Sequence, residues 1–207
     1  MAISLEKIQK LIEQTLASIN EVKRALDEAK GDEEQALLVL RKRGKIVADK
    51  KSSRETKAGI ISSYLHANGR IGVLLELKCE TDFVAKTAEF QSLARDLAMH
   101  IAAMKPGYLK PKDVPADVLE AEKKVYAAQG DIANKPPQIQ QTIIEGRFKK
   151  YYEENCLLSQ SFVKDDSKTV SDLISEYIAK VGENIEVGKF ARYEVKLVCK
   201  VRKVESL

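Results

Sequence analysis

The side chains best placed to act on a partner gather in the stretch Thr81-Asp82-Phe83-Val84-Ala85-Lys86, directly after the strand-like run Ile71 to Cys79. The alternating apolar positions of that run have already ended, so Phe83 is expected at a rim, next to a carboxylate. An apolar ring at a rim usually fits a partner's pocket. Phe83 is therefore either a wedge that enters a partner or, as is commoner for a lone phenylalanine, a plug under the following helix.

Familiar catalytic and metal-binding patterns are absent from the sequence. It has no phosphate-binding glycine loop, no HExxH and no GxSxG. For its two histidines, His66 and His100, a surface or packing role is favoured over a metal or base role. Cys79, Cys156 and Cys199 lie far apart, so they form no CxxC pair and no metal-ligand spacing. Cys79 and Cys199 stand at apolar positions of strand-like runs, which favours a role as small hydrophobes, and an odd count of such thiols fits a reducing compartment. The sequence therefore predicts a protein that is not an enzyme and that needs no metal or cofactor.

Composition and charge predict a helix-rich globular protein in the cytoplasm. Of the 207 residues 32% are charged, with 35 basic against 31 acidic side chains. Such an even balance of basic and acidic side chains argues against a dedicated nucleic-acid or membrane-surface protein. The N-terminus has no signal-peptide pattern and no apolar run approaches membrane-spanning length. We therefore expect no membrane partner and no direct nucleic-acid partner.

Residues 1–44 predict a small module of three amphipathic helices that is similar to a ubiquitin-associated bundle. Apolar residues recur at helical spacing in three successive segments. Gly31 is expected to end the second helix, Asp32 to cap the third, and Gly44 to stop it. The basic stretch over 45–58 then predicts a linker helix, although such a stretch could also contact nucleic acid.

Residues 59–207 predict an α+β core. A hairpin is expected at Asn68-Gly69, because both turn positions of that dipeptide favour positive φ. The alternating segment Ile185 to Val201, with a bulge near Gly188, supplies a third strand. The predicted sheet is thus small, antiparallel and three-stranded, with one water-facing side. Helices are expected over residues 88–104, 116–128, 137–155 and 171–181.

Four segments, in this order along the chain, resemble the short form of the bacterial translation elongation factor Ts family. They are the N-terminal module, Leu75 to Lys86, Leu157 to Val170 and Gly182 to Val195, so the resemblance covers essentially the whole chain. The resemblance implies a guanine-nucleotide exchange factor. Such a factor binds elongation factor Tu in its GDP-bound and nucleotide-free states, promotes GDP release and allows GTP reloading, without bond chemistry of its own.

The resemblance also implies which residues contact the GTPase. Phe83 would wedge between helices of the GTPase domain and Asp82 would disturb its Mg²⁺ side, with Thr81 and Val84 beside them. The family typically has Thr-Gly-Ala-Gly and two methionines where this chain has Thr15 to Asn20, which reduces the apolar contact there to two side chains. The secondary contacts are Leu16, Ile19, His100, Phe162, Val163 and Lys164.

A homodimer is the second predicted assembly. The terminal strand Ile185 to Val201 outruns its hairpin partner and leaves edges that could pair across a two-fold axis. Short members of the family are dimers, and some carry a cysteine where this chain has Ala191, so a covalent link there is excluded. A nucleic-acid-binding module and a ubiquitin-type adaptor stay open as alternatives, but neither explains Asp82 and Phe83.

Overall fold

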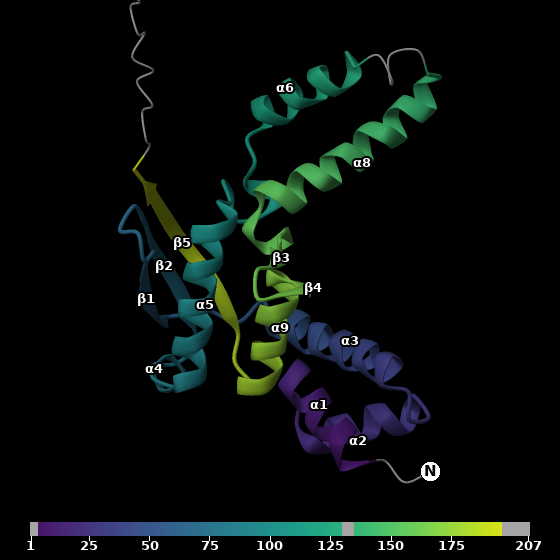
Figure 1. Ribbon diagram of the computed structural model, residues 1–207, viewed down its shortest axis with the longest axis vertical. Coiled ribbons are helices and arrows are strands. Elements are labelled where there is room, and N and C mark those ends of the chain that lie inside the picture. Colours follow the sequence, from purple (N-terminus) through teal and green to yellow (C-terminus); the bar gives the residue numbers. More distant parts are fainter. Residues whose placement is uncertain (1–3, 130–134, 196–207) are drawn as a thin grey trace, which may run out of the picture.

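The N-terminal segment folds into three helices because each begins at a capping side chain and buries one apolar stripe. The computed structural model describes residues 4–129 and 135–195 (Figure 1). Its first helices are α1 (Leu5–Thr15), α2 (Ile19–Glu28) and α3 (Glu33–Lys51), and Asp32 caps α3 as predicted. The predicted three-helix bundle is confirmed. Its buried cluster consists of Ile8, Leu11, Val22, Ala25, Leu26, Ala36 and Leu40.

The third helix does not stop at Gly44, so that prediction is wrong. α3 continues to Lys51, and its second half packs against α9 (Val170–Val181). A Cβ at Gly44 would lie 4.0 Å from the Cβ of Ala179, an ordinary van der Waals distance, so Gly44 stands on the side of α3 that packs against α9. Ala48, one turn further on, is already part of the main core. A lone glycine in a helical pattern can thus mark a packing contact and not an end.

Three strands form the predicted antiparallel sheet. They are β1 (Ala58–Leu65), β2 (Ile71–Cys79) and β5 (Ile185–Glu194), with β2 in the centre. The hairpin between β1 and β2 is confirmed, but its turn is not the expected type. Gly69 has a φ of +69°, whereas Asn68 stays outside the left-handed region and its side chain accepts a backbone hydrogen bond from two residues ahead.

The predicted bulge lies on β5. Leu75 pairs with Phe190 and Leu77 pairs with Val187, so β5 has one residue more than β2 in this interval. Such a bulge restores the alternation of β5 with its neighbour. The part of the predicted strand beyond residue 195 lies outside the described residues.

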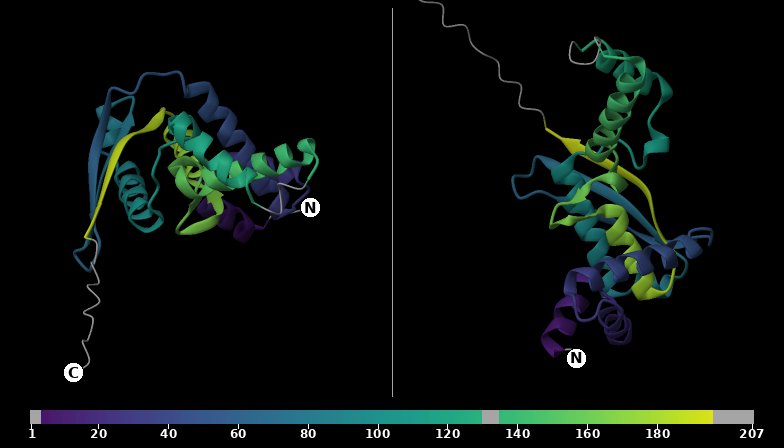
Figure 2. Two further views of the ribbon diagram at one scale, coloured as in Figure 1. Left: turned by 90° about the horizontal axis from the view of Figure 1, so that it is seen from above. Right: turned by 90° about the vertical axis from the view of Figure 1, so that its right-hand side faces the viewer.

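One side of the sheet is packed and the other is open. The inward side chains of β2 meet α5 (Ala88–Met104), and α9 lies against β5 (Figure 2, left). The predicted open face is confirmed, but near the hairpin it is apolar and not polar. Its exposed apolar side chains are Ile61, Leu65, Leu74, Tyr193 and Val195.

A pair of helices projects away from the sheet (Figure 1). These are α6 (Ala116–Ala127) and α8 (Pro137–Asn155), which confirm the prediction of helices in these two regions. In the described part of this pair Ile144 is the one buried residue. The ring of Phe148 lies 5.7 Å from that of Tyr126, and burial raises the pKa of Tyr126 to about 12.

Several short elements were not predicted. β3 (Ser161–Phe162) and β4 (Asp165–Thr169) form a small hairpin, preceded by the 3₁₀ turn η2 (Leu157–Ser159). Its strands lack apolar alternation, so periodicity gives no signal. A second 3₁₀ turn, η1 (Pro111–Asp113), precedes α6, and the one-turn helix α4 (Asp82–Ala85) follows β2.

Candidate partner-binding site

The Thr81-Asp82-Phe83 segment leaves the end of β2 and forms α4. The hydroxyl of Thr81 caps this helix by accepting a hydrogen bond from the N–H of Val84 at 3.4 Å. Val84 and Ala85 are buried in the main core, beside β1 and β2. The inner side of α4 is therefore anchored, and its outer side is left to Asp82 and Phe83.

The ring of Phe83 is 82% exposed. The interpretation of Phe83 as a plug is therefore wrong, because Val84 and Ala85 fill the space beneath α4. Leaving a side chain of this size in water forgoes about 1.5–3 kcal/mol of burial free energy. Asp82 is exposed beside it. The segment thus presents an apolar ring and a carboxylate together on a fixed turn, the arrangement that suits an anchor in a partner's pocket.

His100 lies inside the protein and not at its surface. It is 0% exposed; the N–H of Val163 donates to its Nδ1 at 3.2 Å. The proton is therefore on Nε2, which donates to the Oε1 of Gln160 at 3.0 Å. Burial lowers the pKa of His100, and the ring of Phe162 stacks on it at 5.9 Å. His100 and the buried Phe162 thus hold the segment that presents Val163 and Lys164.

Val163 and Lys164 are exposed at the turn between β3 and β4. The Nζ of Lys164 lies 2.7 Å from a carboxylate oxygen of Asp96, which fixes the turn against α5. α4 adjoins the first turn of α5, and His100, which holds the β3–β4 turn, lies in the last turns of α5. The predicted contacts on α4 and those on the β3–β4 turn therefore lie along the same helix.

Leu16 and Ile19 lie apart from these residues, in the N-terminal helices, with α9 between them and α4 (Figure 1). Leu16 ends α1 in the left-handed region, with a φ of 57°, and Ile19 is 56% exposed at the start of α2. The structure therefore distributes the predicted contact residues over three places: α4, the β3–β4 turn and the α1–α2 turn.

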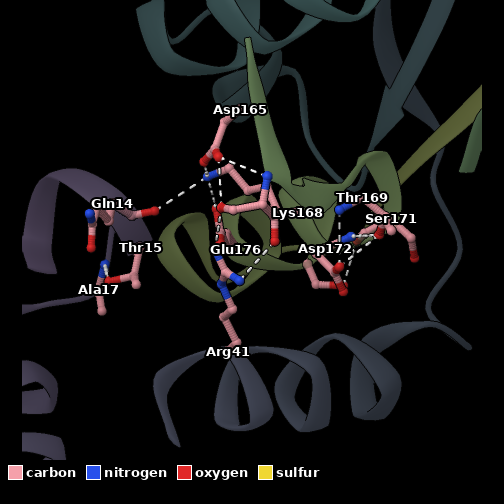
Figure 3. A network of polar contacts seen from close by, with 12 residues as sticks. Gln14, Thr15, Ala17, Arg41, Asp165, Lys168, Thr169, Ser171, Asp172 and Glu176 are labelled. Carbon is pink, nitrogen blue, oxygen red and sulfur yellow. Dashed lines mark hydrogen bonds and ion pairs between the residues drawn. The ribbon is translucent and has the colours of Figure 1, made fainter. Parts of the chain in front are cut away.

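A buried ion pair fixes the N-terminal helices to the core (Figure 3). The Nζ of Lys168 lies 2.8 Å from a carboxylate oxygen of Glu176 and donates to the carbonyl of Gln14 in α1 at 3.3 Å. Arg41 of α3 donates to the carbonyl and the hydroxyl of Ser167. Burial raises the pKa of Glu176, and this effect exceeds the lowering of the pKa by the ammonium group of Lys168. Sequence reasoning missed this network, since its members come from three distant segments.

In the part of the chain that the structure describes, the cysteines and His66 form no catalytic or metal site. Cys79 is a buried free thiol, as predicted. Cys156 is also a buried free thiol, and Cys199 lies outside the described residues. His66 is exposed beside the hairpin, where its Nδ1 lies 3.2 Å from the hydroxyl of Tyr64. Over residues 4–129 and 135–195 there is no cluster of three potential metal ligands. In the same residues no helix is long and apolar enough to cross a membrane.

Comparison with known proteins agrees with the resemblance seen in the sequence. A model of the family described as Elongation factor TS matches residues 3–195. Elongation factor Ts of Thermotoga petrophila is 55% identical over 195 residues, which cover 94% of this chain and 97% of the relative. For Thermotoga maritima the identity is 54% with the same coverage, and for Rubrobacter xylanophilus it is 49%, with 94% and 100% covered. The chain therefore belongs to the elongation factor Ts family, whose members are translation elongation factors.

Proposed function

We propose that this protein is a guanine-nucleotide exchange factor that binds elongation factor Tu, promotes GDP release and allows GTP reloading. The observation that carries the proposal is the exposure of Phe83 beside Asp82 on an anchored turn. The wedge role of Phe83 and the Mg²⁺-side role of Asp82 come from the family resemblance. The anchored turn supports them because it holds both side chains outward before any partner arrives. The proposed place of action is the cytoplasm, where translation occurs.

Exchange of this kind follows from linked binding and requires no bond chemistry. A protein that binds the nucleotide-free GTPase more tightly than the GDP form weakens GDP binding by the same factor. Inverting a population from 1:99 to 99:1 requires about 5.5 kcal/mol of differential binding. An aromatic anchor such as Phe83 can supply roughly 2–4 kcal/mol of it. The carboxylate of Asp82 adds more when it approaches the Mg²⁺ and phosphates, which are the largest local charges.

The remaining contacts divide into those that touch the GTPase and those that support them. Leu16, Ile19, Val163 and Lys164 are available to contact further surfaces of elongation factor Tu. His100 is buried, as is Phe162, so both act by holding the β3–β4 turn in place. This division keeps the predicted set of residues and assigns its buried members a supporting role.

We also propose that two copies of the chain pair through the open face of the sheet. Ile61 is 75% exposed and Tyr193 is 72% exposed on this face, with Leu65 and Leu74 beside them. An apolar patch of this kind on a soluble protein marks an interface, and a two-fold pairing would cover both copies at once. Light scattering should give the mass of two chains, and Tyr193→Glu should reduce it to that of one. A one-chain mass for the parent protein at micromolar concentration would contradict pairing.

The direct test of exchange is the release of fluorescent GDP from elongation factor Tu, followed with and without this protein at fixed Mg²⁺. Catalytic amounts should accelerate release many-fold and should also accelerate GTP uptake. An unchanged release rate at concentrations where the two proteins demonstrably bind would rule out the proposed function.

A further inference from the structure

Both carboxylate oxygens of Glu183 accept hydrogen bonds from Thr81, the N-cap residue of α4. Glu183 follows α9, which ends at Gly182 with a φ of +79°. Its Oε2 accepts a hydrogen bond from the backbone N–H of Thr81 at 3.0 Å, and its Oε1 accepts one from the Thr81 hydroxyl at 2.7 Å. Hydrogen bonds to an ionised carboxylate are among the strong ones. Within the described residues Glu183 has no ion pair, so both oxygens serve Thr81.

The carboxylate also sets the direction of the cap on α4. Because the Thr81 hydroxyl donates its proton to Glu183, its lone pairs are free to accept the N–H of Val84. A single helical turn cannot stabilise itself, since nucleation fixes several residues for one hydrogen bond. The orientation of α4, and with it that of Phe83, therefore depends on a residue that lies 102 positions away in the sequence.

Asn184, the next residue, holds the segment before α4 through Glu80. The backbone N–H of Asn184 donates to the Oε1 of Glu80 at 2.6 Å, and its buried side chain donates to the carbonyl of Arg54 at 2.9 Å. The loop after α9 thus holds both residues that precede α4, and it is itself tied to the chain that enters the sheet.

We propose that Glu183 is a positioning residue for exchange: it fixes the turn that presents Asp82 and Phe83 to elongation factor Tu. It acts through Thr81 and need not touch the GTPase. The proposal rests on the proposed function, and it gives a role to a residue that the sequence analysis included in a family segment without assigning it one. It predicts that loss of the Glu183 carboxylate slows exchange when Asp82 and Phe83 are present, and has a smaller effect when one of them has been replaced.

The test compares kcat/KM for release of fluorescent GDP from elongation factor Tu among variants of the full chain. Glu183→Ala should lower kcat/KM about tenfold, which corresponds to about 1.4 kcal/mol. Glu183→Gln, which keeps one carbonyl acceptor, should lower it about threefold. Thr81→Val, which removes the hydroxyl that donates to Glu183, should lower kcat/KM about as much as Glu183→Ala does. Glu186→Gln, with the same change of charge nearby on β5, is the matched control and should leave kcat/KM within twofold.

A double-mutant comparison separates positioning from a general structural role. In a Phe83→Ala background, adding Glu183→Ala should lower kcat/KM only about threefold or less. An undiminished tenfold effect would overturn the inference, because Glu183 would then act independently of Phe83. A parent-like rate for Glu183→Ala alongside a slow Phe83→Ala would overturn it too, while leaving the proposed function intact. A parent-like rate for Phe83→Ala would instead count against the proposed function. Should Glu183→Ala fail to fold, Glu183→Gln takes its place: its threefold effect should shrink to less than about twofold in the Phe83→Ala background, and an undiminished threefold effect would overturn the inference.

Discussion

Replacing Phe83 by alanine should remove a binding anchor without removing part of the core. The ring is 82% exposed, and the residues that fill the space beneath α4 are Val84 and Ala85. Surface substitutions of this kind usually change the free energy of unfolding by no more than about 0.5 kcal/mol. Loss of an aromatic anchor from an interface weakens binding by roughly 2–4 kcal/mol. Since each 1.4 kcal/mol is a factor of ten, kcat/KM for GDP release should fall about 30- to 700-fold.

The structure offers a matched control in Phe90, the same residue type at the start of α5 but completely buried. Phe90→Ala should lower the free energy of unfolding by about 3–5 kcal/mol. For a chain of this size that corresponds to a fall in Tm of roughly 6–20 °C. Exchange per folded molecule should be nearly unaffected by Phe90→Ala. The two variants should therefore show opposite patterns of stability and activity.

Two measurements decide this prediction together: a thermal melt, and GDP release normalised to the folded fraction. The wedge role requires a normal melt and slow release for Phe83→Ala. A large drop in Tm with normal release per folded molecule would refute it, because Phe83 would then behave as Phe90 does.

Three other perturbations have directions set by the structure. Asp82→Ala should slow GDP release, and the effect should shrink when Mg²⁺ is chelated; an effect independent of Mg²⁺ would argue against action at the Mg²⁺ side. Deleting residues 1–31, which removes α1 and α2 and leaves α3 whole, should weaken binding to elongation factor Tu by roughly 1–3 kcal/mol while leaving a folded core; undiminished affinity in a binding titration would show that these two helices are dispensable. Because burial lowers the pKa of His100, the folded state disfavours its protonation. The free energy of unfolding should therefore be highest above the ordinary histidine pKa of about 6.5 and fall below it; denaturant titrations should show a smaller fall in His100→Gln, and an equal fall would exclude His100 as its source.

Sequence periodicity sufficed where an element's own residues decide its structure. α5 was predicted with its observed bounds, 88–104, because its apolar stripe is continuous and Thr87 caps it. The bulge on β5 was also predicted, because the alternation itself changes phase there. Gly44 shows the limit: as a local signal it reads as a stop, but its role depends on contact with Ala179 of α9. Only the folded chain brings these two residues together.

The candidate site was predicted in part for the same reason. The position of Phe83 at a rim follows from the end of the strand pattern, but whether its ring turns in or out depends on what fills the space beneath α4. Glu183 belongs to a segment that resembles the family, but its role could not be found from local sequence, because a glutamate after a helix resembles any solvated side chain. Its role becomes visible only through its contact with Thr81.

The α1–α2 turn of this chain holds a non-glycine residue in a left-handed conformation. Leu16 stands where the resemblance places a family glycine, and it adopts the left-handed conformation that favours glycine. That conformation costs an L-residue about 1–2 kcal/mol. Ser18 stands at the second glycine position and forms a capping box with Glu21. A cap of this kind contributes about 1 kcal/mol, which offsets much of the strain at Leu16.

The unbroken helix α3 and the Lys168–Glu176 ion pair fix two of the predicted contact places, the α1–α2 turn and α4, relative to each other. α3 packs on α9, and Lys168 links Glu176 of α9 to α1 through the carbonyl of Gln14. Glu183 continues directly from α9 and holds α4. α9 therefore connects the α1–α2 turn with the turn that carries Phe83. These surfaces are therefore already ordered relative to each other when the protein has folded. Binding a partner does not have to order them again, so no entropy is lost for this at association, which is the advantage of a preorganised binding surface. For the proposed exchange function that advantage matters, because the tighter the protein binds the nucleotide-free GTPase relative to the GDP form, the more it weakens GDP binding.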